Sequence, residues 1–429
     1  MEQPSQSASL LRSLPRVDDV IAALESGSHQ RAQAAARQSI DEHRRQILHN
    51  ANGFEAAALR EQVVQRARAL LQEREQPAPR RVLNGTGIIV HTGLGRSLLS
   101  RAATEAVARV AASHCALEVD VETGERGRRD TAVAALLREI TGCEDATVTN
   151  NCAGAMTLAL NTLADGREVV CARGELVEIG GAFRMPDVMA KSGALLHEVG
   201  CTNKTRPSDY AEAINDATGA LLKVHTSNYR VLGFTAEVTL SELVQLGHAR
   251  GLAVIEDLGS GVLVDLSRCG LPGEPRVQES VATGADVVCF SGDKLLGGPQ
   301  CGVLCGTNDA IQRIRGNSLA RALRVDKFTL AALEATLRHY RDEAEAWREI
   351  PTLAALAEPV ENVKKRAQKL KRLIGAQTNA NIRVLPSHAQ AGAGSLPTQT
   401  LPSFAVAITP RNISLDAFAR GLRASTPSV

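Results

Sequence analysis

Three groups of residues combine reactive chemistry with a position at the end of an apolar run. Asp257 closes the run LAVIED, and Lys294 comes two residues after the run ADVVCFSG. The segment TNNCAGAM (149–156) leads from a short polar stretch into a helical pattern. Ligands of open parallel sheets bind beyond the carboxyl ends of the strands, so we expect these groups to form one site.

Each group meets one requirement of pyridoxal phosphate. Asp257 can keep the pyridine nitrogen protonated, Lys294 can bind the aldehyde as a Schiff base, and a helix start offers backbone N–H groups to the phosphate. An ion pair would explain either charged residue alone, but the ordered trio favours the cofactor. The residues expected around the phosphate are Asn150, Asn151, Cys152 and Ala153.

Other cofactor motifs fail on spacing. The lysine of SGDKLLGG precedes its glycines, the reverse of a Walker A loop, and GLGRS (93–97) lacks the third glycine of a dinucleotide fingerprint. The nine cysteines form no CxxC pair and no Cys/His cluster, so we expect reduced thiols and no metal site. With 49 Lys and Arg against 47 Asp and Glu, any nucleic-acid contact must use a local patch.

The elements that would position these residues follow from the pattern of residues 82–327. Short β-branched runs alternate there with helical patterns, which predicts a doubly wound, mostly parallel α/β sheet covered on both faces. Thr239 and Glu242 form a capping box that predicts a helix start, and Gly251 predicts its end. The runs expected to be strands are EVVCAR, ALLHEVG, ALLKVHTS, LAVIEDLG and ADVVCFSG.

Two smaller domains are predicted on either side of this region. Residues 1–75 carry apolar residues at helical spacing and only arginine as their positive residue, followed by a proline-stiffened linker at 74–81. Residues 328–429 begin with a long amphipathic helix and include the strand-like SLPTQTLPSFAVAITP. Because no apolar run reaches the ~20 residues of a membrane span, we expect a cytoplasmic protein without membrane contact.

Longer motifs resemble the bacterial selenocysteine synthases, the L-seryl-tRNA(Sec) selenium transferases. The similarity extends from about residue 10 to the last residue. The motifs that carry it are VLNGTGIIVHTGLGRSLLS, RGELVEIGGAFRMPDVM, HEVGCTNKT, KVHTSNY, DLGSG and FSGDKLLGGPQCG.

The resemblance implies a fold-type I transferase that depends on pyridoxal phosphate. Its large α/β domain would comprise residues 82–327, its small α+β domain residues 328–429, and its helical domain, residues 1–75, would contact tRNA. The implied reaction converts L-seryl-tRNA(Sec) to L-selenocysteinyl-tRNA(Sec) by β-elimination of the seryl hydroxyl and addition of selenium from selenophosphate. The implied assembly is a homo-oligomer, a ring of dimers of decamer size. DNA is not among the implied partners.

The same resemblance assigns roles to residues. Lys294 is the implied Schiff-base lysine, adjacent Asp293 assists it, and Ser291, His225 and Asn228 lie toward the cofactor. A structural hydrogen bond at a strand end explains His225 and Asn228 equally well. The arginines implied to hold the selenium donor are Arg96, Arg321 and Arg324, although the last two also fit an ordinary surface helix.

Two departures from the family pattern leave alternatives open. Cys152 stands where the family has a third polar residue, and the chain ends at STPSV (425–429), where the family continues through further strands. The sequence therefore predicts a small domain with an incomplete sheet. One alternative is a fold-type I enzyme for a free amino acid, a desulfurase or β-lyase; another is a tRNA(Sec)-binding homologue with impaired catalysis.

Overall fold

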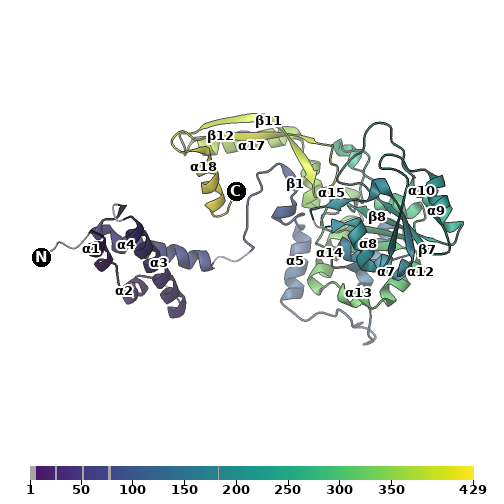
Figure 1. The fold of residues 1–429 in the computed structure, drawn as a ribbon, viewed down its shortest axis with the longest axis horizontal. Helices are drawn as coiled ribbons and strands as arrows, with labels where there is room; N and C mark the ends of the chain where they lie inside the picture. Colours follow the sequence, from purple (N-terminus) through teal and green to yellow (C-terminus); the bar gives the residue numbers. More distant parts are fainter. Residues whose placement is uncertain (1–5, 25–26, 51–52, 76–78, 182) are drawn as a thin grey trace. The chain divides into compact units, whose positions relative to one another are not determined.

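The computed structural model describes residues 6–24, 27–50, 53–75, 79–181 and 183–429 (Figure 1). It divides into two compact units, one of Met1–Leu83 with Leu422–Val429 and one of Asn84–Gly421. Residues 76–78 of the predicted linker lie outside the described residues. In the described part of the chain, no helix has both the length and the apolar character needed to cross a membrane.

The first unit is built from helices around its own small core. Its described helices are α1 (Gln6–Arg12), α2 (Val17–Ala22), α3 (His29–His49) and α4 (Ala56–Glu75). Ile40 and Val63 are buried between α3 and α4, and the hydroxyl of Ser39 donates to the carbonyl of Val63 at 2.8 Å. The end of the chain belongs to this unit because Leu83 donates its backbone N–H to Ser428 at 2.8 Å.

A seven-stranded sheet forms the centre of the second unit. The strand order is β2-β10-β9-β8-β7-β3-β6, and β10 is antiparallel to both of its neighbours. The predicted α/β class with a mostly parallel sheet is confirmed. The strands are β2 (Asp145–Thr149), β3 (Glu168–Ala172), β6 (Leu195–Val199), β7 (Thr218–Val224), β8 (Ala253–Gly259), β9 (Val287–Ser291) and β10 (Gly302–Gly306).

Both faces of this sheet are covered, which explains why its strands are continuous apolar runs. In β9, Val287 and Cys289 pack into one hydrophobic cluster while Val288 and Phe290 pack into another on the opposite face. The helices of this layer system are α6 (Thr131–Thr141), α7 (Cys152–Ala164), α8 (Met185–Ser192), α9 (Pro207–Ala213), α10 (Leu240–His248), α11 (Val277–Ala282), α12 (Asn308–Gly316) and α13 (Leu319–Ala322). A short hairpin, β4 (Glu178–Ile179) and β5 (Phe183–Arg184), precedes α8.

Local capping signals set the helix boundaries that matter for the site. Asn151 is the N-cap of α7, and its side chain accepts from the N–H of Gly154 at 2.8 Å. Thr239 caps α10 in the predicted capping box, with the Glu242 carboxylate accepting from the Thr239 N–H at 2.8 Å. Gly251 follows that helix at φ +65°, a conformation that favours glycine.

A second, three-stranded sheet lies in the same unit, with order β1-β11-β12. Its strands are β1 (Ile88–Val90), β11 (Asn381–Gly392) and β12 (Leu401–Thr409), and β12 lies within the predicted strand segment 395–410. Helix α17 (Val360–Gly375) packs against β11 and β12 (Figure 1). The other helices are α5 (Arg101–Ala111), α14 (Lys327–His339), α15 (Glu343–Glu349), α16 (Pro351–Leu356) and α18 (Leu415–Ala424), and the residues of α18 from Leu422 on are assigned to the first unit.

Candidate active site

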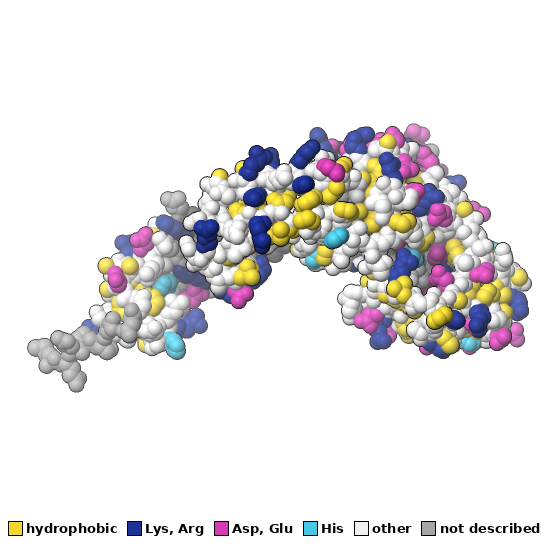
Figure 2. Space-filling model, turned by 90° about the horizontal axis from the view of Figure 1, so that it is seen from above, with side chains coloured by type: hydrophobic (Ala, Val, Ile, Leu, Met, Phe, Trp, Pro, Cys, Tyr) yellow, Lys and Arg dark blue, Asp and Glu magenta, His cyan; other side chains and the backbone are white. Residues whose placement is uncertain are grey.

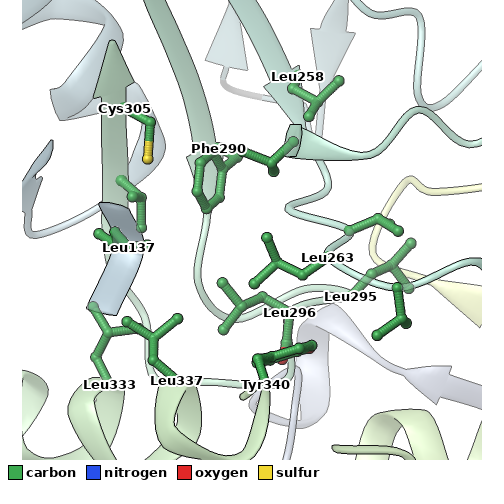
Figure 3. Close-up of a cluster of buried hydrophobic side chains, with 14 of the residues drawn as sticks. Leu137, Leu258, Leu263, Phe290, Leu295, Leu296, Cys305, Leu333, Leu337 and Tyr340 are labelled. Carbon is green, nitrogen blue, oxygen red and sulfur yellow. The ribbon is translucent and has the colours of Figure 1, made fainter. Parts of the chain in front are cut away.

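The loop that carries Lys294 is anchored by the two leucines that follow it. Leu295 and Leu296 are buried among Leu333, Leu337 and Tyr340 of α14 and its C-terminal end (Figure 3). The Tyr340 hydroxyl also donates to the Leu296 carbonyl at 2.7 Å. Burying two leucine side chains contributes roughly 3–6 kcal/mol, so the core holds the backbone next to the lysine firmly.

Glycines allow this loop to lie close to neighbouring backbone. A Cβ atom on Gly292 would meet the Cys301 sulfur and would lie 2.6 Å from the Pro299 carbonyl oxygen. Gly292 itself donates to the Cys301 carbonyl and accepts from Gly298 at 2.9 and 2.8 Å. The glycines after Ser291 therefore serve close backbone approach, as expected for a loop that aims a side chain.

Lys294 is buried, with 7% of its surface exposed, and its amine has no hydrogen bond or ion pair within the described part of the chain. The amine points toward the end of β8, because a Cβ atom on Gly259 would lie 3.8 Å from Nζ and 3.9 Å from the Ser227 hydroxyl. Burying an amine without a partner is costly. A ligand that bonds to Lys294 would remove that cost.

Asp257 lies at the end of the same strand and is also buried. Burial raises the pKa of its carboxyl, while the positive charge of Lys294 and a hydrogen bond from Cys152 oppose the rise. Within the described residues, no ion pair joins Asp257 to Lys294, so the simple ion-pair interpretation does not describe this site. No cationic side chain among the described residues is in direct contact with the carboxyl.

The start of α7 reaches the same edge of the sheet. The Cys152 thiol contacts the Asp257 carboxylate, with Sγ and Oδ1 3.7 Å apart. Burial and the Asp257 charge raise the pKa of this thiol, and a hydrogen bond to Ser291 opposes them. Asn150, Asn151 and Ala153 lie on either side of Cys152, where the first N–H groups of a helix have no carbonyl partner within it.

His225 lies beside the site and introduces a residue that sequence reasoning missed. Its backbone N–H donates to the Asp257 carbonyl at 2.9 Å, and its Nε2 lies 3.5 Å from Oε2 of Glu274. The Glu274 side chain is 1% exposed, and its Oε1 has no partner among the described residues. Glu274 lies in the loop GLPGEP, whose sequence carries no signal for a buried acid.

The residues at this edge fit pyridoxal phosphate. An unpartnered buried amine, a buried carboxyl and a helix start lie together, and two further buried oxygens, Asn228 Oδ1 and Ser260 Oγ, lack partners in the described part of the chain. Asn228 donates from its amide nitrogen to the Glu178 carbonyl at 2.8 Å, which fixes the side chain and leaves its Oδ1 for a ligand. Ser227 and Ser260 were not predicted from the sequence.

Arg96 lies next to the lysine loop. Its Nη1 is 3.1 and 3.0 Å from the two carboxylate oxygens of buried Asp293, across 197 positions of sequence. Arg96 adopts φ 64°, a left-handed conformation that is uncommon outside glycine. Together with Ser97 and Gln300, the pair lines a cavity of about 300 Å³.

Arg321 and Arg324 line a different cavity, of about 330 Å³. Arg324 pairs in a β-bridge with Thr149 and its Nη1 lies 3.4 Å from the Glu118 carboxylate. Asn150 donates its N–H to the Leu323 carbonyl at 2.9 Å, which places this arginine segment beside the start of α7. Within one chain, the three predicted donor arginines are thus divided between two cavities. The other guanidinium groups around this second cavity belong to Arg126, Arg128, Arg129 and Arg315.

Comparisons with known proteins agree with this geometry. A family model described as L-seryl-tRNA selenium transferase matches residues 82–429. The L-seryl-tRNA(Sec) selenium transferase of Carboxydothermus hydrogenoformans is 46% identical over 428 residues, covering 98% of this chain and 91% of that protein. The enzyme of the same name from Solidesulfovibrio magneticus is 53% identical over 356 residues, covering 82% of this chain and 76% of that protein.

A solved structure shares the fold at low sequence identity. The structure of a D-glucosaminate-6-phosphate ammonia-lyase matches with a TM-score of 0.57 and 20% identity, covering 81% of this chain and 86% of that chain. With the family match, this likeness confirms the fold class that the sequence resemblance implied.

Proposed function

The chain belongs to the L-seryl-tRNA selenium transferase family, and we propose that it converts L-seryl-tRNA(Sec) to L-selenocysteinyl-tRNA(Sec) with pyridoxal phosphate as cofactor and selenophosphate as selenium donor. The observation that carries the proposal is that buried Lys294, whose amine has no partner among the described residues, lies beside buried Asp257 and the start of α7. Relatives that carry this name cover nearly the whole chain.

In this proposal, the cofactor is held at three points. Lys294 would bond to its aldehyde, Asp257 would hold its ring nitrogen, and the backbone N–H groups at the start of α7 would bind its phosphate, near Asn150, Asn151, Cys152 and Ala153. His225, Asn228 and Ser291 would contact the ring, since Ser291 ends β9 and the other two follow β7 at this edge of the sheet. When bound, pyridoxal phosphate supplies an electron-accepting ring that stabilises negative charge on the α-carbon of an attached amino acid.

The protein's own residues then handle protons and the selenium donor. The Lys294 amine, once the seryl amine has taken its place on the cofactor, would accept the α-proton of the seryl group and would return a proton to the departing β-hydroxyl. Asp293 is paired with Arg96, which fixes the position of the loop that carries Lys294. Its carboxylate also places a negative charge on the residue next to the lysine. Guanidinium groups suit a phosphate-like anion, so Arg96, Arg321 and Arg324 bind selenophosphate.

The division of these arginines between two cavities supports a homo-oligomer, in which a second copy completes the donor site. We propose the ring of dimers, of decamer size, that the family resemblance implies. The helical residues 1–75 contact the tRNA, and the reaction takes place in the cytoplasm, where aminoacyl-tRNA is used. No DNA takes part.

Incubation with seryl-tRNA(Sec) and selenophosphate tests the function directly. After the reaction, the amino acid esterified to the tRNA is released and identified by mass spectrometry. We expect selenocysteine, formed only when both substrates and cofactor-loaded protein are present. Recovery of serine alone, from protein whose visible absorption shows bound cofactor, would contradict the proposal.

A further inference from the structure

The positive charge of the second unit is concentrated in one segment. Residues 84–357 contain 27 Lys and Arg against 34 Asp and Glu, whereas residues 358–421 contain nine against three. Four of the nine lysines of the chain lie on the single helix α17. Figure 2 shows the Lys and Arg side chains gathered over this part of the molecule.

The spacing of these side chains places them on one side of α17. Lys365, Lys369 and Arg372 are four and three residues apart, so they share a helix face, and Lys364 and Lys371, seven apart, adjoin it. All five are exposed, while Ala367 is buried where the helix packs against β11 and β12. The sheet therefore holds the helix and leaves the cationic face to solvent.

Partners among the described residues account for only two of the positive charges on α17. Arg366 pairs with Glu358 at 3.5 Å, and the Lys364 amine lies 5.4 Å from the Phe404 ring centroid. Within the described part of the chain, the side chains of Lys365, Lys369 and Arg372 have no hydrogen bond or ion pair. Like charges this close repel one another, and a polyanion lying along the helix would relieve that repulsion.

We infer that the α17 face formed by Lys364, Lys365, Lys369, Lys371 and Arg372 binds the phosphate backbone of the tRNA substrate. This inference rests on the proposed function for its partner and adds a contact surface in the second unit. Lys364 to Arg372 extends over about 12 Å of rigid helix, enough to meet several phosphates. Charge contacts of this kind give affinity without base readout, so the surface supports binding rather than tRNA identity.

Several arginines of the first unit are paired within that unit, in contrast to Lys365, Lys369 and Arg372 of α17. Arg66 pairs with Glu42 at 2.7 Å and with Glu73 at 3.0 Å, and Arg74 donates to Gln38. Residues 1–83 contain 12 arginines, and ten acidic residues nearly balance them. Several cations of that unit are thus engaged within it, whereas Lys365, Lys369 and Arg372 of α17 have no partner among the described residues.

A charge-neutralising variant with a matched control tests the inference. The test protein is the full chain with K365Q, K369Q and R372Q, and the control carries K191Q, K204Q and R250Q, which remove two exposed lysines and one exposed arginine elsewhere in the same unit. Binding of a tRNA(Sec) transcript is measured at several salt concentrations. Cofactor absorption confirms that both variants remain folded.

We expect the α17 variant to bind the transcript at least about tenfold more weakly than the parent. The slope of log K against log salt should become less steep by about 2, because three phosphate contacts disappear. The control should match the parent. Equal binding by the α17 variant and the parent, or equal losses in both variants, would overturn the inference. If the parent itself does not bind the transcript, the proposed function fails instead.

A membrane surface is the other polyanion that such a face can meet. Vesicles of phosphatidylserine and phosphatidylcholine test it by co-sedimentation with the same proteins. We expect no difference between the parent and the α17 variant. Vesicle binding that the variant loses, with tRNA binding unchanged, would show that the face meets a membrane and that the tRNA assignment is wrong.

Discussion

Asp257 is the residue whose ionisation the structure constrains most clearly. Burial raises the pKa of its carboxyl above the usual value of 3.8. In the cofactor-free protein, the folded state therefore holds this proton more tightly than the unfolded chain does. The stability that comes from the protonated carboxyl is present below about pH 4 and is lost as the pH rises through the folded pKa.

We predict that Asp257→Asn, which resembles the protonated carboxyl, gains stability relative to the cofactor-free parent as the pH rises. The difference in unfolding free energy between the two proteins should be small near pH 4. It should grow by up to about 1.4 kcal/mol per pH unit until the pH passes the pKa of Asp257 in the folded parent. Urea denaturation of both proteins between pH 4 and 8 measures it. A gap that is constant over this range would show that Asp257 is not buried as described.

Arg96 offers a second test at the scale of one residue. Arg96→Gln removes the cation that faces Asp293 and, in our proposal, the selenium donor. We expect the KM for selenophosphate to rise about tenfold or more, since a charge-assisted contact is lost. The KM for seryl-tRNA and the cofactor absorption should change little. An unchanged KM for selenophosphate would show that Arg96 does not bind the selenium donor.

The sequence indicated some of these residues and not others, for physical reasons. Asp257 and Lys294 follow apolar runs, and parallel strands end at one edge of a sheet, so their proximity could be predicted. The contact between Arg96 and Asp293 joins residues 197 positions apart and has no local signal. The burial of Glu274 beside His225 could not be predicted, because it depends on how the loop around Glu274 folds.

At the scale of elements, the lysine loop depends on glycines that tolerate no side chain. Gly292→Ala would push a Cβ atom into the Cys301 sulfur and the Pro299 carbonyl. We predict a loss of about 1–3 kcal/mol in unfolding free energy and weaker cofactor binding. Urea denaturation and absorption titration with pyridoxal phosphate measure the two effects.

Gly316→Ala is the matched control for that change. It lies at the end of α12, where a Cβ atom would meet nothing within 4 Å. This variant should keep the stability and cofactor affinity of the parent. Equal behaviour of the two variants would mean that close packing of the loop does not position Lys294.

Element boundaries were predictable where the signal is local. The capping box of Thr239 and Glu242 and the Asn151 cap lie within four residues of the turns that they form. The order of the strands depends on contacts between distant segments. The insertion of β10 between β2 and β9, antiparallel to both, could not be derived from the apolar pattern of CGVLC alone.

Considering the whole molecule, residues 20–71 of the first unit contain a hydrophobic core of their own. We predict that deleting residues 1–75 weakens binding of tRNA(Sec) about tenfold or more and leaves the cofactor absorption intact. The deletion keeps Leu83 and its hydrogen bond to Ser428. Filter binding measures the tRNA affinity, and an unchanged value would exclude residues 1–75 from the tRNA contact.

The central claim is that Lys294, among nine lysines, bonds to pyridoxal phosphate. Borohydride reduction of the cofactor-loaded protein makes that bond permanent, and digestion with mass spectrometry locates the attached pyridoxyl group. We expect the group on the peptide that contains Lys294, and no attachment at that peptide in Lys294→Ala. A pyridoxyl group on another lysine, or visible absorption that is unchanged in Lys294→Ala, would contradict it.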